Sequence, residues 1–485
     1  MAVYQNVKFK VYCLNLKLDS RIIPGPAPWF CNGFPNLVQL RKYRSHTLLP
    51  HMLLVVLLLC QSCVVQKLDH TPFPESGYYH NTLAAWDSLP APALCGDTLK
   101  VGWARVNITP PPGTPLAGYG KRRGMKYSAV HDSVWVRTFA FDNGISQAYF
   151  VTLDMLIAPM SVAAELEGKY ESIGLSPEQV YLTATHTHTS FGGWGKKLAG
   201  RIMAGKYRKE VVRQTSMHII QSIKLAQADL QSVRVGYGTA NVAAFVRNRL
   251  TNSEAHRDTT IRFLKFEKQT GEQAILCTFS AHPTILPSRQ PILSGDYPSV
   301  LVQQMEQKVD FAAFSAGAVG SHAAKYTHGD SFESTEEVGV GLATAILAAA
   351  AKTNPTYTSD LQVQRLPLYL SEPQWRIGEN KRLAPGLFYT FFGRYDTYLN
   401  RLQVGNTVLL GVPADYSGEF MPALEAQAAK KRYNVIVTGF NGSYLGYIIP
   451  DQHYGLRKYE ARAMNFYGPT AGSYLSHLLH LLLSK

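Results

Sequence analysis

The sequence predicts an α/β fold, with one large domain in which helices flank a mixed β-sheet. Three observations lead to this fold class. From residue 100 onward, short runs of β-branched and aromatic residues alternate with helical patterns. No internal repeat or convincing linker divides this region. Several side chains suited to chemistry follow the ends of apolar runs, where open α/β sheets bind their ligands.

Strands are predicted where apolar runs are bounded by turn residues. In chain order, the runs are 147–155 (QAYFVTLDM), 179–186 (QVYLTATH), 259–268 (TTIRFLKFEK), 273–282 (QAILCTFSAH), 311–319 (FAAFSAGAV), 406–413 (NTVLLGVP) and 433–440 (YNVIVTGF). Helical periodicity separates them at 161–174, 206–227, 334–352 and 417–431. Ser334 is the expected N-cap of the third helix, because acidic residues follow it within one turn.

Composition and charge limit the classes of partner. Of the 485 residues, 46% are hydrophobic and 17% are charged, as in an ordinary globular protein. The formal net charge is +14, of which residues 1–63 supply +6. The remaining net charge of +8 is compatible with approach to an anionic membrane surface. No Lys/Arg cluster is expected to be interleaved with exposed aromatic residues, so we expect no nucleic-acid partner.

The first part of the chain resembles a targeting segment. Residues 52–63 (MLLVVLLLCQSC) form an apolar run that follows the basic stretch RKYRSH and is too short to span a bilayer. Ser62 precedes Cys63 as in a bacterial lipoprotein signal peptide, so we expect Cys63 to carry a lipid. The alternative interpretation of residues 52–63 is a buried strand or helix. The expected location is the periplasm or cell surface of a bacterium.

The remaining boundaries depend on this interpretation. Residues 1–51 show no clear periodicity, and Met52 is a plausible start, so we expect an over-extended gene model or a leader. Residues 64–98 are turn-rich and are expected to be a tether, which leaves 99–485 as the catalytic domain. Beyond the leader only Cys95 and Cys277 remain, so at most one disulfide and no cysteine zinc site are expected.

Histidines at strand ends are the strongest chemical signal. His186 and His188 end a predicted strand, and side chains at i and i+2 of an extended backbone share one side. This pair alone fits a metal site or an ordinary turn equally well. His282 ends another apolar run before Pro283, which favours a metal site. Zinc binds imidazole and carboxylate groups and keeps a position for water in catalytic sites.

Carboxylates to complete such a site are Asp296 and Asp415, with Glu419 more simply a capping or solvent residue. Asp154 is either an orienting group behind the site or a turn former. His322 and His328 could extend the site, although their spacing does not single them out. Half-buried structural roles explain most of the clustered tyrosines. These are Tyr444, Tyr447, Tyr454 and Tyr459. No nucleophile elbow and no phosphate loop is present, so metal-activated water is the expected nucleophile.

The motifs also carry a family resemblance. The order VGWARVNITPPPGTPLAGYG, VHDSVWVRTFAFDNG, TATHTHTSFGG, VRNRL, FSAHPT and YLGYIIPDQHYGLRKYEA resembles the catalytic domain of neutral (alkaline, non-lysosomal) ceramidases over roughly residues 100–475. The family's C-terminal immunoglobulin-like domain is not expected here. The resemblance implies a zinc-dependent hydrolase that cleaves the amide bond of ceramide to a sphingoid base and a fatty acid.

The resemblance also implies roles for particular residues. Zinc ligands would be His186, His282, Asp415 and Tyr447, with aspartate at 415 where the family usually has glutamate. His188 would carry protons, and Arg249 and Tyr459 would contact the substrate or the oxyanion. The family's serine, in a GDVSPN-like stretch, matches Ala323, and Ser321 lies two residues away.

Two other functions stay open. The first is a zinc hydrolase acting on a different amide or ester, because Ala323 replaces the family's serine. The second is a surface lipoprotein that binds a ligand on a degenerate enzyme scaffold. Membrane contact through a lipid anchor and an N-acyl lipid or other amide substrate are the expected partners.

Overall fold

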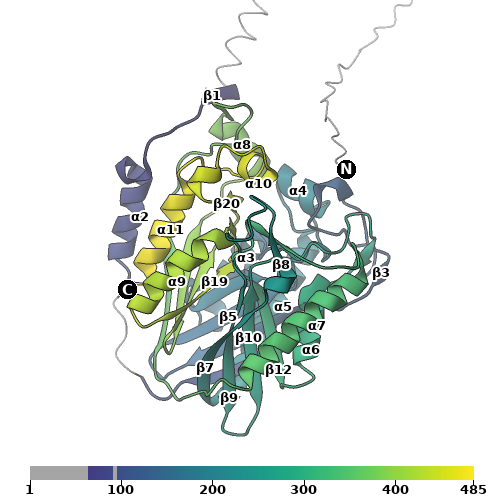
Figure 1. Cartoon of the computed structure of the whole chain (residues 1–485), viewed down its shortest axis with the longest axis vertical. Helices are drawn as coiled ribbons and strands as arrows, with labels where there is room; N and C mark the ends of the chain where they lie inside the picture. The colour runs from purple at the N-terminus through teal and green to yellow at the C-terminus, as the bar shows by residue number, and fades with distance from the viewer. Residues whose placement is uncertain (1–63, 91–95, 485) are drawn as a thin grey trace, which may run out of the picture. The chain divides into compact units, whose positions relative to one another are not determined.

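The computed structural model describes residues 64–90 and 96–484 (Figure 1). An eight-stranded mixed sheet has the order β12-β10-β9-β7-β2-β4-β5-β6. Its strands are β2 (Lys100–Asn107), β4 (Trp135–Asp142), β5 (Gln147–Leu153), β6 (Val180–Ala184), β7 (Gln231–Asn241), β9 (Thr260–Lys268), β10 (Gln273–Phe279) and β12 (Phe311–Ala316). A second sheet contains β14 (Leu361–Pro367), β16 (Tyr398–Val404), β17 (Thr407–Val412) and β19 (Asn434–Gly439).

Four short strand pairs complete the β-structure. They are β1 (Val65–Lys67) with β15 (Lys381–Leu383), β3 (Ala129–Val130) with β11 (Ile292–Leu293), β8 (Val246–Asn248) with β13 (His322–Ala324), and β18 (Asp415–Tyr416) with β20 (Tyr447–Ile448). The helices are α2 (Gly77–Asp87), α3 (Met160–Glu167), α4 (Leu198–Ala204), α5 (Lys209–Ala228), α6 (Asp296–Met305), α7 (Phe332–Ala350), α8 (Pro385–Phe392), α9 (Met421–Lys430), α10 (Tyr459–Arg462) and α11 (Ala471–Leu482).

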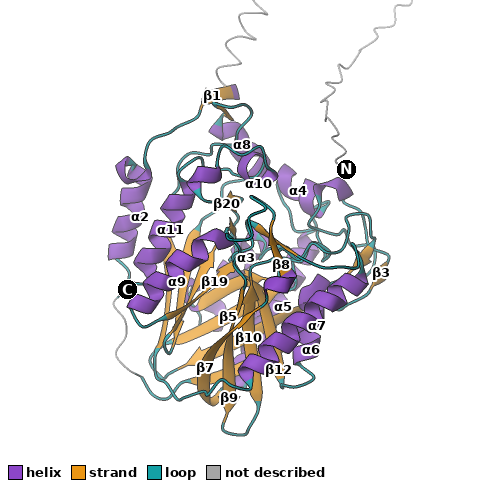
Figure 2. Cartoon of the chain, in the orientation of Figure 1, coloured by secondary structure: helices purple, strands orange, loops and turns teal. Residues whose placement is uncertain are grey.

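The sheets pack on each other and helices cover their outer faces (Figure 2). One buried cluster joins Phe139 and Phe266 of the large sheet to Leu409 and Ile436 of the second sheet. Helices α3 and α5 pack on β4, β5 and β6, and α6 and α7 pack on β9, β10 and β12. Helices α9 and α11 pack on the second sheet. The predicted mixed α/β fold is confirmed, and the structure adds the second sheet.

Burial on both faces explains the apolar strand sequences. Strands β5 and β10 alternate between the inner cluster and the helix-covered side, so nearly every residue in them is buried. The alternation is clear in β5, where Phe150 joins the inner cluster and Val151 joins the cluster under α5. Apolar runs with few polar residues therefore correctly predicted the strands of this sheet.

Two local predictions are corrected. The third predicted helix, α7, is capped by Ser331 rather than Ser334, because the Ser331 hydroxyl accepts the Ser334 backbone N–H. Part of the expected tether is folded: α2 lies within 64–98, and its Tyr78 and Tyr79 pack on the core beside α11. The Thr82 and Tyr474 hydroxyls are 2.7 Å apart, which fixes α2 to α11.

Several predictions concern residues outside the described part of the chain. The leader, the apolar run 52–63, Cys63 and Cys95 lie there. Cys277 is buried in β10. Among the described residues, no helix has both the length and the apolar character that a membrane crossing requires.

Candidate metal centre

The candidate site lies where strands of both sheets end. Strand β6 ends two residues before His186, β10 ends three residues before His282, and β17 ends three residues before Asp415. Asp415 begins β18 and pairs in parallel register with Tyr447 of β20. Residues distant in sequence are therefore brought to one place by the backbone of the two sheets.

The two histidines of the HTH stretch meet by a different route from the one predicted. The strand has ended at Ala184, and His186 has a φ of 63° in the left-handed region. The backbone turn, rather than strand alternation, brings the Nε2 atoms of His186 and His188 to 3.2 Å. A non-glycine residue with this φ is strained, which is common at functional sites.

Backbone carbonyls fix the protonation of all three imidazoles. The Nδ1–H of His186 donates to the Leu156 carbonyl at 2.6 Å, and that of His188 donates to Gly118 at 2.8 Å. The Nδ1–H of His282 donates to the carbonyls of Val319 and His322, at 2.8 and 3.0 Å. Carbonyl oxygens only accept, so each Nε2 of the neutral ring keeps a lone pair. Metal-binding histidines are oriented by such bonds.

The Asp415 carboxylate faces imidazole nitrogens that carry lone pairs and cannot donate hydrogen bonds to it. The Asp415 Oδ1 atom lies 2.9 Å from the Nε2 of His282 and 3.4 Å from that of His186. This oxygen is buried and accepts no hydrogen bond from any of the described residues. Burial lowers the pKa of His282 to about 4 and that of His188 well below its usual range, so both rings stay neutral.

A metal ion fits this arrangement. Two ligands at about 2.0–2.1 Å from a tetrahedral ion lie about 3.3 Å apart, close to the separations of the Asp415 oxygen and the imidazole nitrogens. The ligand-capable atoms of His186, His188 and His282 all lie within 4.8 Å of one another. A cation would neutralise the carboxylate and use the lone pairs that face it. Like the other two histidines, His188 bonds a carbonyl through Nδ1 and keeps a free Nε2, so this geometry does not separate a ligand role from a proton-carrying role.

Tyr447 and Arg249 border the cluster. The Tyr447 hydroxyl lies 3.0 Å from the His282 Nε2, and it accepts a hydrogen bond from the Arg249 Nη2 at 2.7 Å. Burial raises the pKa of Tyr447 well above its usual value. Glu460 forms an ion pair with the Arg249 Nε at 2.8 Å, so the guanidinium is held from its other side.

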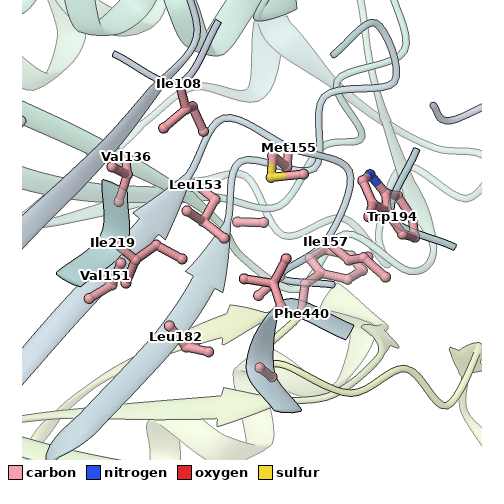
Figure 3. Close-up of a cluster of buried hydrophobic side chains, with 14 of the residues drawn as sticks. Ile108, Val136, Val151, Leu153, Met155, Ile157, Leu182, Trp194, Ile219 and Phe440 are labelled. Atoms are coloured by element: carbon pink, nitrogen blue, oxygen red, sulfur yellow. The ribbon is translucent and has the colours of Figure 1, made fainter. Parts of the chain in front are cut away.

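Sequence reasoning missed three supporting residues. The Tyr444 hydroxyl donates to Asp415 Oδ2 at 2.6 Å, which leaves Oδ1 facing the histidines. Phe440 stacks on His186, and Glu460 orients Arg249. Figure 3 shows Phe440 among the side chains of the adjoining hydrophobic core, with Leu153, Met155 and Ile157 nearby. The only sequence signal for Tyr444 was its place in the tyrosine cluster.

Two other carboxylate candidates have structural partners. Asp154 Oδ2 accepts the Trp135 backbone N–H at 2.9 Å, which matches the turn-forming alternative. Asp296 begins α6 and accepts backbone N–H groups of Leu286 and Tyr297. The hydrogen bonds described for either carboxylate come from backbone N–H groups and not from the cluster histidines.

Glu419 is neither a capping nor a solvent residue. Its side chain is 6% exposed, lies 3.0 Å from the His453 Nε2, and accepts from the Asn248 amide. Ser417 provides the cap, because its hydroxyl accepts the Glu419 backbone N–H. A buried carboxylate needs such partners. The prediction was wrong because no local pattern shows that Asn248 and His453 would be near.

The two other histidine candidates, His322 and His328, bond other partners. His322 accepts the Asp258 backbone N–H at its Nε2 and bonds the Ser321 hydroxyl at its Nδ1. His328 pairs with Glu337 at the surface.

The serine position also has a definite environment. Ser321 lies in a turn, so the extended backbone needed for it to share a face with residue 323 is absent. Its hydroxyl bonds His322 and Ser417. Ala323 pairs with Arg247 in β8 and bridges His282. The serine expected from the resemblance is replaced by alanine beside a candidate metal ligand.

The members of the site differ in their exposure to solvent. His186, His282 and Asp415 are fully buried, whereas His188 and Arg249 are partly exposed. Tyr459 is 53% exposed, and its ring meets that of Tyr447 edge-on at 5.8 Å. His188, Arg249 and Tyr459 are therefore the solvent-facing members of the site.

Comparison with known proteins agrees with the resemblance seen in the motifs. Residues 99–335 match the family described as "Neutral/alkaline non-lysosomal ceramidase, N-terminal". This part of the chain belongs to that ceramidase family. The family region contains His186, His188, Arg249 and His282, whereas Asp415 and Tyr447 lie beyond it.

Curated ceramidases are distant relatives. The neutral ceramidase of Pseudomonas aeruginosa is 25% identical over 228 residues, which cover 43% of this chain and 34% of that protein. The neutral ceramidase of Mycobacterium tuberculosis is 21% identical over 221 residues, covering 42% and 34%. The aligned regions thus span about a third of these relatives' length.

The fold similarity extends further along the chain. The crystal structure of the Pseudomonas aeruginosa ceramidase matches with a TM-score of 0.70 at 18% identity, over 81% of this chain and 74% of that one. A structure titled "Ceramidase complexed with C2" matches with a TM-score of 0.71 at 18% identity, over 80% and 75%. The shared fold therefore includes residues beyond the ceramidase family region.

Proposed function

We propose that this protein is a zinc-dependent hydrolase that cleaves the amide bond of an N-acyl lipid, with ceramide as the leading candidate. The observation that carries the proposal is the position of the His186 and His282 Nε2 atoms, 3.4 and 2.9 Å from the Asp415 Oδ1, with the His188 Nε2 3.2 Å from that of His186. Imidazole and carboxylate ligands suit zinc. The ligands proposed are His186, His282, Asp415 and Tyr447.

Zinc in this position would lower the pKa of a water molecule and polarise an acyl carbonyl. The chain supplies the other functions. His188 has an unprotonated Nε2 beside the cluster and a fixed Nδ1–H, so it can take a proton and return it to the leaving amine. Arg249 remains a cation beside Tyr447 and can stabilise negative charge on the carbonyl oxygen. Tyr459 is exposed at the entrance and is proposed to hold the substrate.

A second substrate class is favoured by one observation. Ala323 occupies the position of the family's serine and bridges the backbone of His282. A change this close to a proposed ligand is compatible with a different amide or ester substrate. Metal-dependent chemistry would be common to both candidates.

The experiment compares metal content and hydrolysis in matched histidine variants. The purified chain is loaded with zinc, analysed for metal, and assayed on ceramide, other N-acyl compounds and esters. His186→Ala should lose both zinc and turnover. His188→Ala should keep zinc and lose turnover by at least about 100-fold, as expected for a general acid–base residue. His328→Ala, an exposed histidine, is the control and should change neither.

Each alternative has a distinct outcome. Loss of zinc in His188→Ala would make His188 a ligand. Turnover of another N-acyl compound but not of ceramide would favour the second substrate class. Zinc binding with no turnover of any compound would overturn the enzyme proposal in favour of a ligand-binding protein. A zinc-free wild-type chain after loading would overturn the metal site.

We also propose export with a lipid on Cys63, based on the apolar run 52–63 and the residue that precedes the cysteine. Intact-mass analysis of the membrane fraction tests this. A mature chain that begins at an acylated Cys63 is expected, and a peptide from residues 1–51 in the mature protein would contradict it.

A further inference from the structure

Helix α4 exposes an apolar face next to the candidate site. Leu198 and Ile202 are 49% and 50% exposed, and they lie four residues apart, so they share one face of the helix. Single exposed apolar residues are ordinary on a protein surface, but a contiguous group marks an interaction site.

A second apolar element adjoins α4. Helix α8 lies against it and has the sequence PGLFYTFF, in which Phe391 is 38% exposed. The hairpin before α8 exposes Ile377, and Val64, whose carbonyl accepts the Ala384 N–H, is exposed at the start of α8. Figure 1 shows β1, α8, α10 and α4 at the same end of the fold. We call the exposed side chains Val64, Leu198, Ile202, Ile377 and Phe391 the α4–α8 surface.

Positive charge surrounds the α4 part of this surface. Residues 194–208 contain no acidic residue, and the exposed bases around α4 are Lys196, Lys197, Arg201 and Lys206. The neighbouring 3₁₀ turn η2 (Gly120–Arg122) adds exposed Lys121, and Arg123 follows it. No carboxylate of the described residues forms an ion pair with these side chains. Leu and Ile side chains ringed by Lys and Arg fit a membrane interface better than an apolar protein partner.

The surface is linked to the candidate metal centre through two hydrogen bonds. The Gly118 N–H donates to the Met203 carbonyl of α4 at 3.1 Å, and the Gly118 carbonyl accepts the Nδ1–H of His188 at 2.8 Å. The ring of Tyr119, next in the chain, lies 5.1 Å from that of His188. The partly exposed side of the site therefore borders the same end of the fold.

We propose that the α4–α8 surface docks on the headgroup region of an anionic phospholipid bilayer. Apolar side chains would enter the acyl boundary while the lysines and arginines contact lipid phosphates. The inference deepens the proposed function, because an N-acyl lipid would be delivered from the bilayer to the entrance near His188 and Tyr459. The α4–α8 surface also includes Val64, which directly follows Cys63 in the sequence.

Vesicle binding tests the proposal without any turnover. The full chain carries Cys63→Ser in every variant, so that no lipid can be attached. Co-sedimentation is measured with phosphatidylcholine vesicles and with vesicles that also contain phosphatidylglycerol, neither of which has an amide to cleave. Leu198→Glu with Ile202→Glu should lower the partition coefficient on anionic vesicles by at least about tenfold. Met217→Glu with Leu225→Glu, on α5 with exposures of 49% and 48%, is the matched control and should not.

The apolar residues 52–59 are present in every variant and could themselves bind vesicles. A second measurement therefore reports on contact with the bilayer at single positions. Two variants are compared, Ile202→Trp and Met217→Trp, and the fluorescence that each adds is tested for quenching by lipids with brominated acyl chains. Quenching at 202 but not at 217 is expected. Equal quenching at both positions, or none at 202 in the bound chain, would overturn the proposal.

Other occupants give other results. A wild-type dimer that becomes a monomer in the Leu198→Glu, Ile202→Glu variant, with unchanged vesicle binding, would make the surface a self-association interface and overturn the proposal. Equal binding to neutral and anionic vesicles would overturn the proposed preference for an anionic bilayer. Loss of vesicle binding with intact turnover of a soluble substrate would support docking, and absence of turnover in all variants would count only against the proposed function.

Discussion

The ring of Phe440 stacks on the imidazole of His186, with centroids 3.9 Å apart and planes 4° apart. Both residues have left-handed backbone conformations, with φ values of 69° and 63°. Such conformations cost about 1–3 kcal/mol per residue and persist only when surrounding packing holds them. Phe440 therefore connects the hydrophobic core to the geometry of the candidate metal ligand.

Truncating Phe440 should affect both stability and metal binding. Phe440→Ala is expected to lower the free energy of unfolding by about 3–5 kcal/mol and to weaken zinc binding about tenfold or more, because His186 loses its support. Denaturant titration and zinc competition with a chelator measure the two effects. Phe266→Ala, in the core between the sheets, should destabilise similarly but leave zinc affinity unchanged in the folded protein. Equal affinity losses in both variants would contradict the role given to Phe440.

Tyr444 should act through Asp415. Tyr444→Phe removes the hydrogen bond to Asp415 Oδ2 and lets the carboxylate rotate, so we expect about 10-fold weaker zinc binding. Competition with a chelator measures this change. Tyr454→Phe is the matched control, because the Tyr454 hydroxyl bonds none of the residues that the structure describes. Unchanged affinity in Tyr444→Phe would show that Asp415 is oriented by its backbone alone.

Glu460 should position Arg249 without binding metal. Glu460→Gln removes the charge that pairs with the Arg249 Nε, so we expect turnover to fall about tenfold while zinc content is kept. Steady-state kinetics and metal analysis on the same preparation separate these effects. Glu379→Gln breaks an exposed pair with Arg462 and should leave both values unchanged. Zinc loss in Glu460→Gln would assign the residue a structural role in the ligand cluster.

Ser321 should not be the nucleophile. Its hydroxyl is hydrogen-bonded to His322 and Ser417, so Ser321→Ala should cost about 1 kcal/mol of stability and retain turnover within about threefold. The assay uses whichever substrate the wild-type chain hydrolyses. A loss as large as that of His188→Ala would instead support a serine-dependent mechanism.

Asp154 should make stability depend on pH. Burial raises the pKa of this carboxyl to about 6, against the opposing effect of Arg137 and with smaller increases from Asp132 and Glu306. The unfolded carboxyl, with a pKa near 3.8, ionises first, so the folded state binds more protons between about pH 4 and pH 6. Its contribution to stability therefore falls as pH rises through this window.

Asp154→Asn should remove that dependence, because the amide oxygen can still accept the Trp135 N–H. The difference in unfolding free energy between wild type and variant should change by about 3 kcal/mol from pH 4 to pH 7. Urea titrations at several pH values measure it. A constant difference across this range would contradict the raised pKa.

The sequence by itself determined the fold class and the order of most strands and helices. Apolar runs bounded by turns identified β5, β6, β10, β12, β17 and β19, because strands buried on both faces have few polar residues. It also placed His186, His282 and Asp415 after strand ends, since local hydrophobicity and chain direction are enough to show that. Their partners are set by contacts between distant segments.

Tertiary structure decided the strand pairing and the contacts between residues far apart in sequence, which local sequence patterns do not predict. The second sheet and its shared core depend on which strands pair, and this depends on packing over the whole chain. The left-handed turn at His186, the Nδ1 bonds to carbonyls and the contacts of Tyr444 and Glu460 join residues far apart in sequence. Glu419 shows the same limit, because a carboxylate is predicted to face solvent until distant residues are found to bury and pair it.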